Sequence, residues 1–191
     1  MSVTRVQLGL LRAYSWWLLA LGLRRPAQQV FDRMLALAPG HAFALASRAH
    51  LSAELGAHQA AIADLQRLTA IQPDNPAAWF NLGFLLDVAG RPAEAEPALR
   101  AAVALDPKLD RAWYGLGLAL LQLQRVDEAI AAFQRNTELQ PMRPYGWTQL
   151  ARAHARQQRA QEVERIVEHL RGFEPKVAAA LDHELKRAAG A

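Results

Sequence analysis

Apolar and polar positions alternate most regularly in residues 76–109, and they do so with the period of a helix. Apolar or small residues recur there at offsets of three, four and seven, which is one face of a helix: Trp79, Leu82, Gly83 and Leu86. After Gly90, a second stripe repeats at four and three residues: Ala95, Leu99 and Ala102. The segment is therefore predicted to form a helix, a turn and a second helix.

The same pattern recurs along the chain with a fixed period of 34 residues. Five prolines mark this period: Pro39, Pro73, Pro107, Pro141 and Pro175. Self-similarity at this spacing is typical of a solenoid, in which each unit buries its apolar face only against its neighbours. We therefore expect a single domain over 1–191, with units at about 8–41, 42–75, 76–109, 110–143 and 144–177, and a polar cap helix at about 178–189.

Two local features bear on the turns and helices of these units. Gly22, Gly56 and Gly90 are also 34 residues apart, where a left-handed residue would end the first helix of a unit. Gln124 and Gln158 replace glycine in the last two units, so those turns are expected to be strained or differently shaped. Pro97 interrupts the second helix of its unit, which we expect to start late or to bend.

The order of these residues resembles the tetratricopeptide repeat, whose pattern is a Trp, a Leu-Gly pair, a Tyr, an Ala, a Phe and a closing Pro. The resemblance extends over residues 8–177 and is most specific in 76–143. It is weaker in 8–75, where the first two units have Leu11 and Leu45 in place of the Trp, and Tyr14-Ser15 and Arg48-Ala49 in place of the Leu-Gly pair. The resemblance implies an all-α, right-handed superhelical solenoid that acts as a non-catalytic adaptor or scaffold for another protein.

The composition of the chain excludes several classes of function and indicates no catalytic chemistry. There is no Cys, and the formal net charge is only +4, so neither thiol chemistry nor nucleic-acid binding is expected. The six His have no metal-ligand spacing, and there is no glycine-rich phosphate loop. We therefore expect no catalytic residue, metal or cofactor.

The resemblance also implies that the first helix of each unit lines a concave groove. The residues that it places there are Phe43, His50, Phe80, Asn81, Phe84, Arg111, Tyr114, Leu118, Tyr145, Arg152 and Arg156. Exposed rings beside arginines suit a peptide or helix with apolar anchors and an acidic or C-terminal carboxylate end. The alternative is that the rings only pack between adjacent units. The carboxylate clamp of some family members is incomplete here, because only Asn81 and Arg111 match it.

The segment SWWLLALGL at residues 15–23 is more apolar than the first unit requires. It is too short to span a membrane, and it lacks the cleavage site of a secretory signal. Its surplus apolar residues, Trp16, Trp17 and Leu21, are interpreted as a second interface. The candidates are a partner protein, a second copy of the chain, or a membrane surface beside Arg24 and Arg25, with protein contact preferred.

Two functional hypotheses follow from the sequence. The first is an adaptor that binds a partner peptide in the groove. The second is an assembly or maturation factor, or an accessory subunit of a larger complex that includes a membrane protein, docked through the N-terminal helix. Both imply a cytoplasmic location, with peripheral attachment to the inner membrane face as an option. The sequence leaves the partner and the oligomeric state open.

Overall fold

The computed structural model describes residues 3–189, and this range is all-helical. Its helices are α1 (Val3–Ala20), α2 (Arg24–Leu37), α3 (Ala42–Glu54), α4 (His58–Ile71), α5 (Pro76–Val88), α6 (Pro92–Leu105), α7 (Asp110–Gln122), α8 (Val126–Leu139), α9 (Pro144–Arg156), α10 (Ala160–Arg171) and α11 (Pro175–Ala189). The first helix begins five residues before the first expected unit. The last begins at Pro175, a residue type that is favoured in the first turn of a helix.

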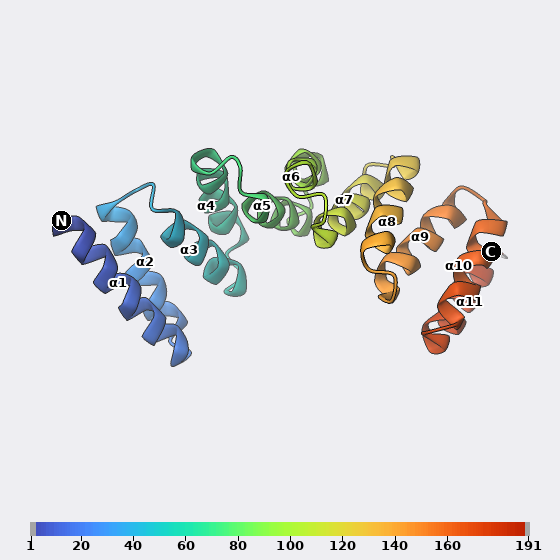
Figure 1. The fold of residues 1–191 in the computed structure, drawn as a ribbon, viewed down its shortest axis with the longest axis horizontal. Coiled ribbons are helices and arrows are strands. Elements are labelled where there is room, and N and C mark those ends of the chain that lie inside the picture. The colour runs from blue at the N-terminus through green and yellow to red at the C-terminus, as the bar shows by residue number, and fades with distance from the viewer. Residues whose placement is uncertain (1–2, 190–191) are drawn as a thin grey trace.

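The helices stack in chain order into one extended array, with α1 at one end and α11 at the other (Figure 1). Each helix packs mainly on the helices before and after it, and the weaker contacts skip one helix, as between α5 and α7. Short-range packing of this kind is the defining property of a solenoid. The fold is an all-α superhelical solenoid of helical pairs, as the 34-residue period predicts.

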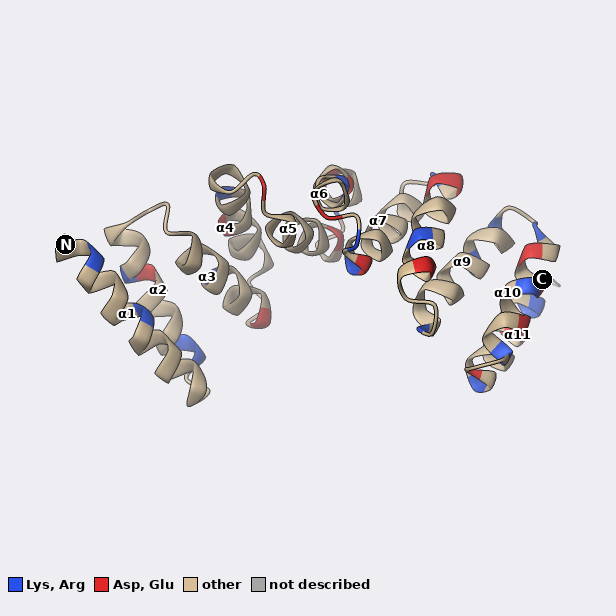
Figure 2. Cartoon of the chain, viewed as in Figure 1, with Lys and Arg blue, Asp and Glu red and all other residues tan. Residues whose placement is uncertain are grey.

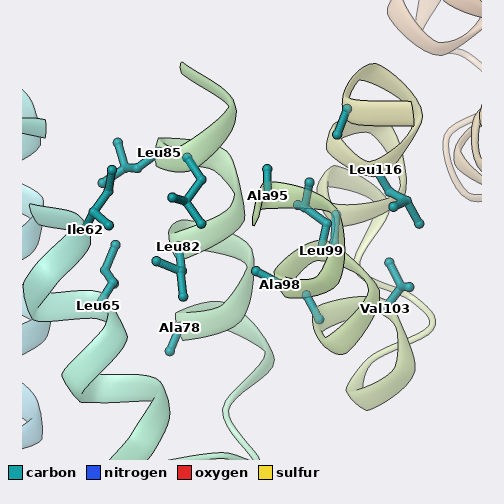
Figure 3. Packing of buried hydrophobic residues seen from close by; sticks show 14 of the residues in the cluster. Ile62, Leu65, Ala78, Leu82, Leu85, Ala95, Ala98, Leu99, Val103 and Leu116 are labelled. Atoms are coloured by element: carbon teal, nitrogen blue, oxygen red, sulfur yellow. The ribbon is translucent and has the colours of Figure 1, made fainter. Parts of the chain in front are cut away.

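The core is a continuous layer built from the predicted stripes. One buried side chain per unit recurs at the 34-residue period in the second helix of each pair: Phe31, Leu65, Leu99, Phe133 and Val167. Figure 3 shows how Leu82 and Leu85 of α5 lie toward Ile62 and Leu65 of α4. Each unit thus buries apolar surface on both of its neighbours, which is why the array is stable only as a whole.

Small residues at the predicted positions let the two helices of a unit approach closely. A Cβ atom added at Gly83 would lie 2.6 Å from Cγ of Leu99, and one at Gly117 would lie 2.5 Å from Cε1 of Phe133. Ala151, at the same position of the fifth unit, is fully buried. A larger side chain at these positions would separate the helices.

All five turns within the units have the same backbone conformation. The φ angles are 71° at Gly22, 78° at Gly56 and 72° at Gly90, and they remain positive at Gln124 (62°) and Gln158 (56°). The expectation of a differently shaped turn is therefore wrong. The strain is present, because a residue with a Cβ atom occupies a left-handed conformation at both glutamines.

Pro97 does not delay the start of its helix, which was one of the two expected effects. The helix α6 runs without interruption from Pro92 to Leu105, with Pro97 inside it. Pro92 occupies the first turn, where its ring is favourable, and Ala95, Ala98 and Leu99 are buried in the core. This packing offsets the loss of one backbone donor at Pro97.

The recurring Trp and Pro are joined by a hydrogen bond that their spacing alone did not indicate. The indole Nε1 of Trp113 donates to the carbonyl oxygen of Pro107 at 3.0 Å. Trp79 donates to Pro73, and Trp147 donates to Pro141, both at 2.8 Å. Each half-buried Trp therefore fixes the loop that connects its unit to the preceding one.

Candidate functional site

The first helices of the third, fourth and fifth units, α5, α7 and α9, form the walls of a groove with a volume of about 350 Å³. Six of the predicted groove residues line it: Phe80, Phe84, Arg111, Tyr114, Leu118 and Tyr145. Asn136 of α8 and Gln140, which directly follows α8, add polar groups, and Leu99 of α6 adds an apolar one. Its size lies within the range of ligand-binding pockets in proteins.

The four rings in the groove fall into two kinds. Tyr114 is half-buried and contacts the core ring of Phe133 edge to face at 5.9 Å, so the alternative interpretation, packing between helices, holds for this residue. Phe80 is also half-buried, and its ring stacks on Phe84 at 6.2 Å. In contrast, Phe84 is 51% exposed and Tyr145 is 69% exposed. These two rings offer apolar surface that the fold itself leaves uncovered.

Two arginines mark one end of the groove. The guanidinium of Arg111 lies over the Phe80 ring, 4.9 Å from its centroid. Arg143, which immediately precedes α9, lines the same groove, and neither arginine has a carboxylate partner within residues 3–189. Both lie at helix N-termini, where the helix dipole adds positive potential. This end of the groove is suited to an anionic group.

An acid lies at the C-terminal end of α5. Asp87 lines the groove, and its carboxylate accepts a hydrogen bond from Nε2 of Gln122 at 2.7 Å. Burial raises the pKa of Asp87 above its ordinary value, against the opposing effect of this hydrogen bond. Because no Lys or Arg of the described chain forms an ion pair with it, Asp87 is available to a donor group of a ligand.

Arg152 and Arg156, which were also predicted for the groove, are not among the residues that line it. Arg152 binds Glu184 of α11 through two hydrogen bonds, Nε to Oε1 at 2.9 Å and Nη2 to Oε2 at 2.8 Å. Both arginines line a separate hollow beside the cap helix. The guanidinium of Arg152 thus attaches the cap to α9 rather than facing a ligand.

The three remaining predicted residues also lie outside the main groove. His50 and Asn81 line a smaller hollow of about 150 Å³, which adjoins the groove because Phe84 borders both. Phe43 contacts Phe31 edge to face at 6.0 Å, and Arg12 lies over its ring. The groove is therefore shorter than the sequence register implied.

Arg143, Asp87 and Asp110 are the charged groove residues that the prediction left without a role. Arg143 was missed because the register counted only positions inside first helices, whereas Arg143 lies in the preceding turn. The basic residue directly before Pro144, which opens α9, is a signal that could have been used. The Trp16, Trp17 and Leu21 side chains are 65%, 62% and 68% exposed on and beside α1.

Two further findings concern the described residues alone. No cluster of three or more His, Asp or Glu in residues 3–189 is arranged to hold a metal ion. Within the same range, none of the helices combines the length and apolar character needed to cross a bilayer.

Comparison with known proteins agrees with this architecture. A tetratricopeptide repeat model matches residues 80–144, and a second model, described as a TPR repeat, matches residues 50–86. Comparison with curated proteins gave no match. With the 34-residue period and the paired helices, these matches show that the chain belongs to the tetratricopeptide repeat family.

Solved structures of the same fold cover nearly the whole chain. MamA (41-end) from Desulfovibrio magneticus RS-1 is 24% identical, with a TM-score of 0.78 over 95% of this chain and 96% of that one. YrrB, described as a TPR protein with an unusual peptide-binding site, is 18% identical, with a TM-score of 0.80 over 90% and 89%. PilF of Pseudomonas aeruginosa is 19% identical, with a TM-score of 0.71 over 98% and 94%. At these identities the likeness is one of fold.

Proposed function

We propose that this protein is a non-catalytic adaptor that binds a short segment of a partner protein in the groove between α5, α7 and α9. The observation that carries the proposal is the exposure of Phe84 and Tyr145 in a groove whose arginines, Arg111 and Arg143, have no carboxylate partner within residues 3–189. Concave apolar surface with a few convergent polar groups is the usual form of a binding site.

The charges of the groove define the chemistry of the segment. An acidic side chain or a C-terminal carboxylate binds Arg111 and Arg143, where charge-assisted hydrogen bonds and the two helix N-termini act together. One or two apolar side chains pack on Phe84 and Tyr145. A hydrogen-bond donor or basic group faces Asp87. The partner segment is thus apolar in its centre and acidic at one end.

The peptide-binding site described for YrrB supports this proposal by analogy, because the two chains share the fold over most of their lengths. The identity is 18%, so the argument for this chain rests on its own groove residues.

The test is a selection from a displayed random peptide library, followed by affinity measurement with the enriched peptides. We expect the enriched peptides to combine apolar residues with a carboxylate. Phe84→Ala and Arg111→Glu should each weaken binding about 10-fold or more, as expected for the centre of an interface. Val88→Ala is the matched control, because Val88 is 52% exposed on the same helix but does not line the groove.

Two results would overturn the proposal. One is enrichment of peptides whose binding is insensitive to both groove substitutions. The other is equal weakening by Val88→Ala. Thermal unfolding of each variant, monitored by circular dichroism, separates lost binding from lost folding.

A further inference from the structure

The helix α1 carries two apolar stripes on different faces. One stripe packs on the array through Leu8, Leu11, Ser15 and Leu18, of which the last two are buried. The second follows the helical period along the whole helix: Val3, Val6, Leu10, Tyr14 and Trp17. All five of these side chains are exposed, with values of 46–74%.

This second stripe is long and continuous, unlike the apolar exposure elsewhere. At 1.5 Å per residue, α1 extends for about 27 Å. Trp16 and Leu19 on other faces of α1, and Leu21 and Leu23 in the turn that follows it, are also exposed, and Trp16 contacts Trp17 edge to face at 5.7 Å. More than half of the exposed large apolar side chains of the described chain lie in residues 3–23. Contiguous patches of this kind are rare on monomeric proteins and mark an interaction surface.

The charge around the stripe has a single sign. The first acidic residue of the chain is Asp32, so residues 1–31 contain four arginines and no Asp or Glu. Figure 2 shows the consequence: α1 carries basic positions only, whereas α8, α10 and α11 carry both signs. An anionic surface complements this excess of basic residues.

One arginine of the neighbouring helix lies beside the apolar face. Arg33 of α2 lines an open hollow with Leu10, a member of the stripe, and with Leu37. Helical geometry places Arg5 and Arg12 about 150° around α1 from the centre of the stripe, and the Arg12 guanidinium lies over the Phe43 ring. Arg25 and Arg33 are exposed, and neither has a carboxylate partner within residues 3–189.

We propose that α1 lies flat on an anionic lipid surface, with the stripe in the acyl boundary and Arg25 and Arg33 at the phosphates. Exposed Trp and Tyr suit this boundary because each combines an apolar ring with a polar group. Interfacial helices combine an apolar face of this kind with nearby arginines. Because its other stripe is packed on α2, α1 rests on the surface without crossing the bilayer.

The sequence alone favoured contact with a protein at this surface. The charge distribution is the reason for favouring contact with lipid instead. Two copies of α1 placed together would bring two surfaces of the same sign into contact, with no acid in either helix. The groove lies on α5, α7 and α9, away from α1 along the array (Figure 1). Lipid binding through α1 therefore leaves the groove accessible, and this inference stands apart from the proposed function.

The experiment is co-sedimentation of the full chain with two kinds of vesicle, phosphatidylcholine alone and phosphatidylcholine with phosphatidylglycerol. We expect the protein to pellet with the anionic vesicles and much less with the neutral ones. Trp17→Glu and Leu10→Glu should each reduce the bound fraction about 10-fold. Arg25→Glu/Arg33→Glu should reduce binding to anionic vesicles by about 10-fold or more and leave the weak neutral binding unchanged.

The matched control is Met142→Glu, which adds the same charge at an apolar side chain that is 66% exposed far from α1. This control should bind as the wild type does. The proposal is overturned if the wild type stays in the supernatant with anionic vesicles, or if Met142→Glu and Trp17→Glu lose binding equally. A dimer in light scattering that Trp17→Glu dissociates, without vesicle binding, would instead assign the stripe to a second copy.

Discussion

Arg48 binds Asp64 through two hydrogen bonds, Nε to Oδ2 at 2.7 Å and Nη2 to Oδ1 at 2.6 Å. The Asp64 side chain is only 4% exposed, and Arg48 also donates to Asp32 at 2.7 Å. These contacts raise the pKa of Arg48, with the Asp64 hydrogen bonds as the largest cause. These ion pairs account for Arg48 at a position where the family pattern has a Leu. Arg48 of α3 connects that helix to α2 through Asp32 and to α4 through Asp64.

Removal of Arg48 should destabilise the array strongly. Arg48→Met removes both hydrogen bonds to the buried Asp64 carboxylate and leaves it only the Arg67 guanidinium at 3.9 Å, and breaking a buried ion pair in this way costs about 3–5 kcal/mol. The free energy of unfolding, measured by urea denaturation, checks this value. The double variant Arg48→Met/Asp64→Leu should recover much of the loss, because no buried charge remains. A single variant as stable as the wild type would contradict this account.

Relief of the strained turn before α10 should stabilise the protein. Gln158→Gly removes the Cβ atom from a residue with a φ of 56° and should raise the free energy of unfolding by about 1 kcal/mol. The control is Gln157→Gly, since Gln157 has a φ of −91° and gains nothing from glycine. Thermal melts of the two variants should shift in opposite directions, and equal shifts would contradict the explanation.

Arg143, directly before α9, and Arg152, within α9, should differ in their effect on peptide binding. Arg143→Glu should weaken the binding of an acidic peptide in the groove about 10-fold or more, because a positive guanidinium is replaced by a carboxylate that repels the acidic group of the peptide. Arg152→Ala should leave affinity within about two-fold, since its guanidinium is bound to Glu184. Fluorescence anisotropy with one peptide compares them. Equal losses would mean that the cap arginine also contacts the ligand.

His154 should make the array less stable as the pH falls. Burial lowers the pKa of His154 below its ordinary 6.5, and Arg159 lowers it further. Below about pH 6.5 the unfolded chain binds a proton that the folded chain does not, so the free energy of unfolding decreases with falling pH.

The change in stability between about pH 7.5 and about pH 5.5 should be smaller for His154→Leu than for the wild type. Both proteins share the other five histidines, whose contributions cancel in this comparison. Parallel stability curves for the two proteins would rule out His154 as the origin of the pH dependence.

The architecture could be predicted because its determinants are local and repeated. The stripes, the glycines of the turns and the 34-residue prolines each report on a helix or a turn, and neighbouring units confirm one another. Only details that depend on packing were wrong, such as the start of α6 at Pro92 despite Pro97. The surplus exposure of Trp16 and Trp17 also followed from the helical period, since one face cannot bury two stripes.

The site was predicted in part. A register of first-helix positions found Phe80, Phe84, Arg111, Tyr114, Leu118 and Tyr145, which the structure brings together. It could not distinguish Phe84, whose ring is exposed, from Tyr114, whose ring contacts Phe133, because both occupy groove positions of the pattern.

By itself, the sequence determined the period, the helical pairs and the face of each helix that is buried, because these follow from the geometry of a single helix and its repetition. Only the tertiary structure decided which charges are available. Arg152 is occupied by Glu184, 32 residues away, whereas Arg143 and Asp87 face the groove without an ion-pair partner in the described chain. Side-chain pairing across helices depends on how those helices pack, and a one-dimensional pattern does not contain that distance.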